Sequence, residues 1–120
     1  MSTQSQDTFI NSMKDIESEL RDMGFSHLST TKKGYATYVD YKSVENIQAS
    51  FMFGPSEWHV EFVLIINGKK YELKDLLQIP IIAEWTRSKS QEQTSNIIKD
   101  EIVWFVDLLR FVITTQPLTN

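Results

Sequence analysis

The sequence of 120 residues contains no cysteine, which excludes thiolate nucleophiles, disulfide bonds and cysteine-type zinc sites. It has only two histidines, His27 and His59, and neither has a second imidazole at the spacing of a metal-ligand pair. No glycine-rich phosphate loop and no nucleophile elbow is present. We therefore expect no metal, no cofactor and no catalytic activity.

Long hydrophobic runs are also missing. The most apolar stretch, Val60 to Ile66, contains Glu61 and is far shorter than the roughly 20 residues that a membrane helix needs. The polar N-terminal residues lack the basic and apolar regions of a secretory signal. Together with the lack of cysteine, these features predict a cytoplasmic protein that does not enter a membrane.

Positive charge is in the minority. Twelve Lys and Arg stand against sixteen Asp and Glu, for a net charge of -4. A negatively charged protein repels phosphate backbones, so we expect no nucleic acid ligand. The same charge would attract a basic protein partner. A chain of this length buries enough surface to fold without covalent staples, and we expect one domain over residues 1–120 with an ordered core at about 7–115.

Apolar residues at spacings of three and four predict two principal helices. The first covers Asp7 to Met23, with Asp7 as its N-cap and Gly24 as a left-handed stop. A capping box at residues 90–93 predicts the start of a long second helix that runs to about Thr114. Short helical turns are expected at 74–78 and 80–87.

Between these helices the apolar pattern changes to period two. This pattern predicts strands at 35–41, 47–53 and 58–66 and a fourth strand after the Asn67-Gly68 turn. A polar loop is expected at 26–33, before the first of these strands. Pairing of Ile66 with Lys69 and of Phe53 with Trp58 would place ten side chains on one buried face: Ile47, Ala49, Phe51, Phe53, Trp58, Val60, Phe62, Leu64, Tyr71 and Leu73. The expected fold class is α+β, in which an N-terminal helix, a four-stranded antiparallel meander and short helices precede a long C-terminal helix packed on one sheet face.

The apolar residues of the long helix, from Ile98 to Ile113, cover more than half of its circumference. Two explanations remain open: the helix packs against both the sheet and the first helix, or it also forms a homodimer with a second copy. Glu101 lies within this arc, and we expect its carboxylate to reach solvent at the edge of the helix.

Two surfaces are candidates for binding a protein partner. The first is an acidic stripe on the first helix, formed by Asp15, Glu19 and Asp22. The second is the far face of the sheet, where His59 is expected near Met52 and where apolar anchors are flanked by charge. That face could equally be an ordinary solvated surface or be covered by the short helices. Its candidate partner-binding residues are Tyr38, Asp40, Met52, His59, Glu61 and Glu72.

The stretch from Leu64 to Leu77, with its Asn67-Gly68 turn and with Trp85 following, resembles small acidic immunity proteins that bacteria make against delivered toxins, including those of contact-dependent inhibition. The small size, the lack of cysteine and the order of elements are also similar. The resemblance implies a noncatalytic cytoplasmic protein that binds a basic toxin domain and occludes it. The alternative is a dimeric, acidic secretion-type chaperone that holds an effector segment across its sheet. The wide apolar arc favours the alternative, and the absence of a helix between the predicted strands speaks against it.

Overall fold

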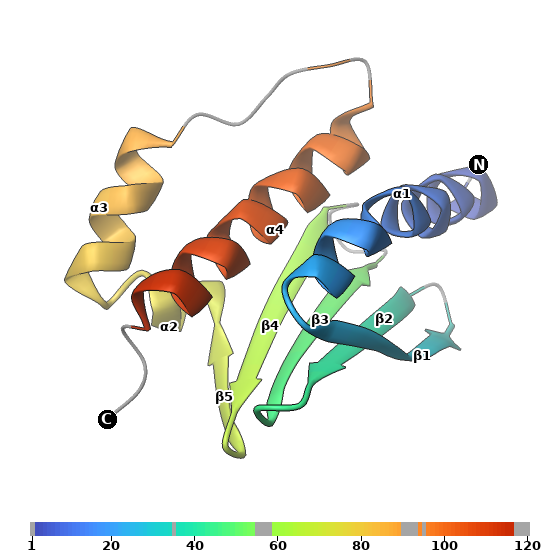
Figure 1. The fold of residues 1–120 in the computed structure, drawn as a ribbon. Coiled ribbons are helices and arrows are strands. Elements are labelled where there is room, and N and C mark those ends of the chain that lie inside the picture. Colours follow the sequence, from blue (N-terminus) through green and yellow to red (C-terminus); the bar gives the residue numbers. More distant parts are fainter. Residues whose placement is uncertain (1, 35, 55–58, 90–93, 95, 117–120) are drawn as a thin grey trace.

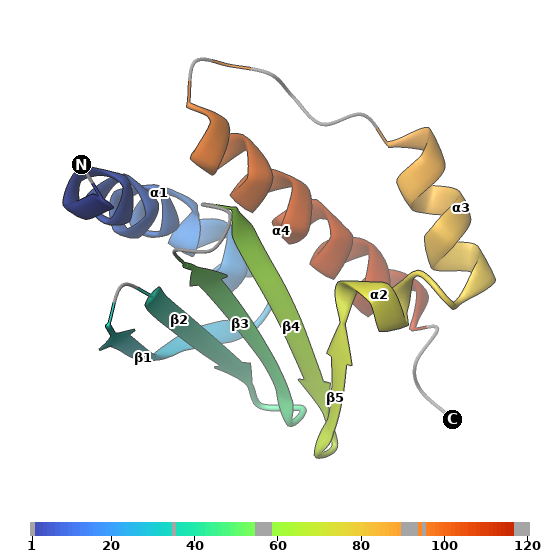
Figure 2. The ribbon, with the colours of Figure 1, turned by 180° about the vertical axis from the view of Figure 1, so that it is seen from behind.

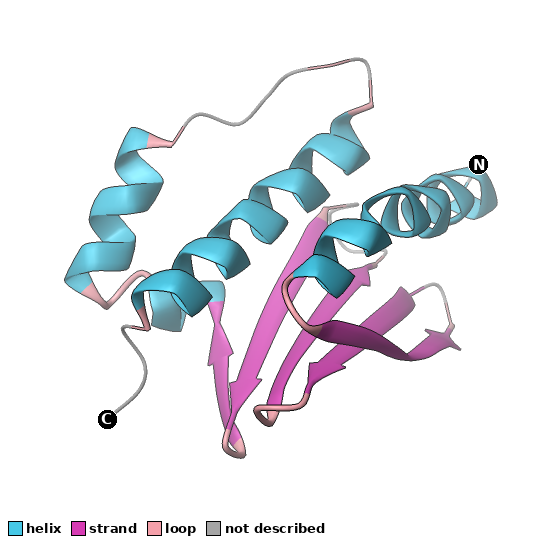
Figure 3. Ribbon diagram, in the orientation of Figure 1, coloured by secondary structure: helices cyan, strands magenta, loops and turns pink. Residues whose placement is uncertain are grey.

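The computed structural model describes the chain apart from residues 1, 35, 55–58, 90–93, 95 and 117–120, and it describes residues 2–5 by their backbone only. The chain forms an α+β fold with an antiparallel sheet, as the sequence predicts (Figures 1 and 3). In chain order the elements are α1 (Ser2–Asp22), β1 (Phe25–Lys33), β2 (Ala36–Ser43), β3 (Ile47–Phe53), β4 (Val60–Ile66), β5 (Lys69–Glu72), α2 (Leu73–Leu76), α3 (Pro80–Ser88) and α4 (Ile97–Thr115).

The sheet has five strands in the order β1-β2-β3-β4-β5, rather than the four expected. The additional strand, β1, occupies residues predicted to be a polar loop, so that prediction is wrong. Nearly all of β1 is exposed on both faces, which removes the apolar alternation that marks a half-buried strand. A register shift between His27 and Ser29 interrupts the pattern further.

The β4–β5 hairpin follows the prediction. Ile66 pairs with Lys69, and Asn67 and Gly68 both have positive φ, at 51° and 85°, as a type I′ turn requires. Leu64 pairs with Tyr71, which keeps the inward side chains of the two strands in register.

The β3–β4 pairing differs from the prediction. Phe53 pairs with Val60, not with Trp58, and Phe51 pairs with Phe62. The connection is therefore two residues longer than the four-residue turn expected, and Trp58 lies outside the described residues. A shift of two leaves the paired side chains of β3 and β4 on their predicted faces, because side chains alternate with period two. The buried face accordingly forms as expected around Ala49, Phe51, Phe53, Val60, Phe62 and Leu64.

Both long helices cover that face, α1 over the β1–β3 side and α4 over β4 (Figures 1 and 2). Phe9 of α1 stacks on Phe53 with ring centroids 5.7 Å apart, and Phe105 of α4 stacks on Phe62 at 5.3 Å. These aromatic contacts join each helix to a central strand and place the core between the sheet and the helices.

The starts of both helices differ from the prediction. The helix α1 already begins at Ser2, so Asp7 is not its N-cap, although its stop at Gly24 is confirmed by a φ of 93°. The helix α4 begins only at Ile97, where the side chain of Asn96 accepts a hydrogen bond from the N–H of Lys99. The capping box expected to open this helix lies at residues 90–93, outside the described part of the chain.

The wide apolar arc of α4 is shared among three neighbours within the chain. The sheet and α1 cover part of it, and Trp85 of α3 packs against another part. The Trp85 ring stacks on Phe111 at 5.3 Å and lies 5.7 Å from the ring of Trp104. Packing within the chain therefore buries much of the arc, and Trp104, Phe111 and Ile113 stay half-buried.

Candidate protein-binding face

The second face of the sheet is not covered by any helix in the part of the chain that the structure describes. The helices α1 and α4 lie on the opposite face, α2 follows the end of β5, and α3 packs on α4 (Figure 2). Every described side chain that the strand register places on this face is exposed or half-buried. We call this surface the outer face; on β2 to β5 it consists of Tyr38, Asp40, Lys42, Gln48, Ser50, Met52, Glu61, Val63, Ile65, Lys70 and Glu72.

The register orders these side chains into three rows that run across the strands. The first row consists of Tyr38, Met52 and Glu61. The second contains Asp40, Ser50, Val63 and Glu72, and the third contains Lys42, Gln48, Ile65 and Lys70. The outer face therefore carries carboxylates in the first two rows and ammonium groups in the third, and each row contributes one apolar side chain, Met52, Val63 or Ile65.

A groove of about 600 Å³ extends over the outer face and also reaches the core residues Val60, Phe62 and Phe105. Its lining includes Met52, Val63 and Ile65, with Glu61 and Lys70 among its charged groups. An apolar floor with a few charged groups at its margins has the composition of a protein-binding surface. The structure thus brings together five of the nine predicted partner-binding residues, namely Tyr38, Asp40, Met52, Glu61 and Glu72.

The three carboxylates of the outer face differ in their surroundings. Glu72 lies 3.7 Å from the ammonium group of Lys70 and 3.8 Å from that of Lys74. Asp40 accepts a hydrogen bond from the hydroxyl of Ser29 at 3.2 Å. The side chain of Glu61 is exposed, and its carboxylate has no hydrogen bond or ion pair to any described residue. Glu61 is therefore the carboxylate most available to an incoming cation.

His59 does not lie on the outer face, so its predicted position near Met52 is wrong. Its ring nitrogen Nδ1 lies 2.9 Å from the carboxylate of Glu101 on α4, which packs on the opposite face. The other carboxylate oxygen of Glu101 accepts a hydrogen bond from the backbone N–H of Val60 at 2.9 Å. The expectation that Glu101 reaches solvent is also wrong, because its side chain is only 17% exposed.

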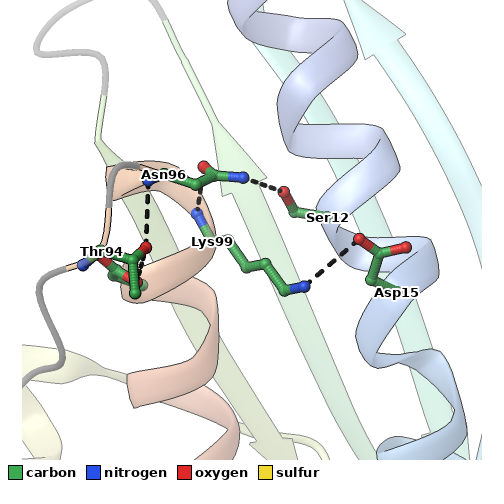
Figure 4. A network of polar contacts seen from close by, with 6 residues as sticks. Ser12, Asp15, Thr94, Asn96 and Lys99 are labelled. Carbon is green, nitrogen blue, oxygen red and sulfur yellow. Dashed lines mark hydrogen bonds and ion pairs between the residues drawn. The ribbon is translucent and has the colours of Figure 1, made fainter.

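The acidic stripe of α1 is exposed, but two of its three carboxylates form ion pairs with cations of α4. Asp15 forms an ion pair with Lys99 at 3.5 Å (Figure 4), and Glu19 forms one with Arg110 at 3.2 Å. Asp22 is exposed at the end of the helix. The stripe is therefore partly neutralised by Lys99 and Arg110, which a helical projection of α1 alone does not reveal.

Near Asp15, a polar network attaches the start of α4 to α1 (Figure 4). The amide nitrogen of Asn96 donates to the hydroxyl of Ser12 at 3.4 Å. The buried carboxylate of Asp100 accepts from the backbone N–H and the hydroxyl of Thr94, at 2.7 and 2.8 Å. Every polar group of this network has a partner within the chain, so it is structural.

Sequence reasoning did not identify a small cleft of about 170 Å³ between α1 and the β1–β2 strands. Tyr41 lies in it, is 1% exposed, and donates a long hydrogen bond of 3.4 Å to Glu17. Burial raises the pKa of the Tyr41 phenol above its ordinary value of 10.0, and the charge of Glu17 and this hydrogen bond act in the same direction. The sequence does not predict this cleft, because one of its walls is β1, which was expected to be a loop.

No family model, curated protein or solved structure matches this chain. Within the described residues, no three His, Asp or Glu side chains are grouped as a metal site would require. None of the described helices has the length and apolar character needed to cross a bilayer.

Proposed function

We propose that this chain is a noncatalytic immunity protein that binds a toxin through its outer face and neutralises it by occlusion. The observation that supports this proposal is the uncovered outer face itself. It combines a groove of about 600 Å³, an apolar centre at Met52, Val63 and Ile65, and charges of both signs at its margins. A sheet face with an apolar centre flanked by charges of both signs has the composition of a protein-binding surface.

Occlusion requires a rigid surface, because an ordered binding face loses little conformational entropy on association. The outer face is built on strands, and the packing of α1 and α4 on their other side holds those strands in place. A partner that covered the groove would bury the side chains of all three rows. Charges at the margins would orient the encounter and reject partners of the wrong pattern.

The secretion-type chaperone is the weaker candidate. The wide apolar arc of α4 favoured it, and α3 covers the part of that arc that contains Trp104 and Phe111. No described helix stands between consecutive strands of the meander, whereas the chaperone pattern would place one there. We therefore do not propose it as a second function.

The test is a tagged capture from the native cell, repeated with the product of the adjacent gene co-expressed. We expect a stoichiometric complex whose partner kills cells only when this chain is absent. The substitution Val63→Glu places a charge in the centre of the outer face and should abolish both capture and protection. Val44→Glu is the matched control, because Val44 is 98% exposed in the β2–β3 turn. A partner that is nontoxic, or that Val63→Glu captures equally well, would overturn the proposal.

A further inference from the structure

We infer that the first row of the outer face, Tyr38, Met52 and Glu61, receives an arginine side chain of the partner protein. This inference rests on the proposed function and specifies the chemistry of one part of the same surface. The row carries an aromatic ring, a thioether and a carboxylate on three neighbouring strands. Those three groups match the three parts of arginine: a planar cation, an apolar stem and a fork of N–H donors.

The register brings the three side chains close enough to act together. Tyr38 is directly opposite Met52, and Met52 is directly opposite Glu61. Directly opposed residues have Cβ atoms about 5 Å apart, so a head group above Met52 is within reach of both flanking side chains. A guanidinium there can stack on the Tyr38 ring and donate hydrogen bonds to the Glu61 carboxylate.

Gly54 explains how Met52 forms the floor of this row. The φ of Gly54 is not in the left-handed region, so its backbone does not require glycine. A Cβ at this position would instead lie 2.9 Å from the Met52 sulfur and 3.7 Å from the Cβ of Ala36. The absence of a side chain at Gly54 therefore gives the thioether room to lie close to the backbone.

The charges of the outer face favour a cation at the first row and disfavour one at the third row. Glu61 is exposed and has no cation of its own among the described residues, whereas Glu72 lies near Lys70 and Lys74. The ammonium groups of Lys42 and Lys70 belong to the third row. An incoming arginine is thus attracted at the first row and repelled at the third. Arginine is favoured over lysine because only a planar guanidinium stacks on the tyrosine ring while donating in a fork.

The experiment is a titration of the isotope-labelled protein with N-acetyl-arginine-N-methylamide, followed by amide and methionine-methyl NMR spectra. The lysine and norleucine analogues are titrated in parallel. We expect saturable shifts centred on Tyr38, Met52 and Glu61, weaker shifts with the lysine analogue, and none with norleucine. Glu61→Gln should weaken arginine binding about tenfold, the range of a charge-assisted contact, and Glu84→Gln is the matched exposed control.

Gly54→Ala provides an independent variant, since it displaces Met52 without removing any charge. It should move the Met52 methyl resonance and weaken arginine binding while the fold persists. Shifts that are absent, that centre elsewhere, or that are unchanged in Glu61→Gln would overturn the arginine assignment. Failure of this assignment can be distinguished from failure of the proposed function. If Val63→Glu loses the captured toxin while Glu61→Gln binds it normally, the outer face binds the toxin but its first row does not receive an arginine.

Discussion

Glu101 of α4 accepts a hydrogen bond from the backbone N–H of Val60, at 2.9 Å, and so connects the long helix to the first residue of β4. Val60 is 5% exposed, which leaves its N–H little access to water if the carboxylate is removed. The same carboxylate contacts His59 through its second oxygen. This contact fixes the end of β4 that borders the groove of the outer face.

We predict that Glu101→Ala lowers the free energy of unfolding by about 1.5–3 kcal/mol, the range for a hydrogen bond to a charged group whose donor is then left buried. Glu101→Gln keeps an acceptor oxygen and should cost less than Glu101→Ala. Urea unfolding followed by tryptophan fluorescence measures both values. The exposed Glu84→Ala serves as control. Equal stability of Glu101→Ala and the control would show that the contact does not form in solution.

Asn96 provides the second prediction, because its side chain has two partners. Its carbonyl oxygen caps the N–H of Lys99 at 3.0 Å, and its amide nitrogen reaches Ser12 on α1. Asn96→Ala should destabilise the fold by about 1 kcal/mol, the usual value of an N-cap. Asn96→Asp retains the cap and loses the donor to Ser12, so it should fall between Asn96→Ala and wild type. Thermal unfolding of the three proteins tests this order.

The third prediction concerns alkaline pH. The raised pKa of Tyr41 means that the folded chain keeps this proton above pH 10, whereas the unfolded chain loses it near the ordinary value of 10.0. The stabilising contribution is complete below the unfolded pKa and is lost as the pH rises through the folded pKa. Phenolate absorbance should therefore show one of the four tyrosines titrating later than the others. A Tyr41→Phe variant in which the late titration persists would contradict this assignment.

The sequence predicts those strands of the fold that bury one face. The strands β2, β3 and β4 bury one face, so their alternation was visible. The strand β1 buries little beyond Phe25, and a strand exposed on both faces shows no alternation of apolar and polar residues. The start of α4 was misplaced because the polar segment before Asn96 fits a cap at several positions.

The candidate site shows the same dependence. The two-residue alternation placed Tyr38, Met52 and Glu61 on one face even though the β3–β4 register was wrong by two residues. Local sequence patterns do not predict whether the carboxylates of the acidic stripe have cation partners. Whether Asp15 and Glu19 are free depends on Lys99 and Arg110, which are more than 80 residues away in the chain. Long-range ion pairs carry no local sequence signal.

The fourth prediction follows from a buried hydroxyl. The Oγ1 of Thr37 is buried and has no hydrogen-bond partner in the described part of the chain, and the residue is 0% exposed. Burying an unsatisfied hydroxyl costs about 1–3 kcal/mol. Thr37→Val replaces the hydroxyl with a methyl group of similar volume and should raise the free energy of unfolding by about 1 kcal/mol. A loss of stability in chemical denaturation would indicate that the hydroxyl has a partner.

The affinity of the captured complex shows whether the outer face binds the partner. Val63 occupies the middle row of that face, so a charge there should weaken binding at least roughly 30-fold, as expected for the centre of an interface. Val44→Glu introduces the same charge in the β2–β3 turn and should leave the dissociation constant unchanged. Calorimetric titration of the folded variants with the partner decides the question. A Val63→Glu protein that binds as tightly as Val44→Glu would show that the outer face does not bind the partner.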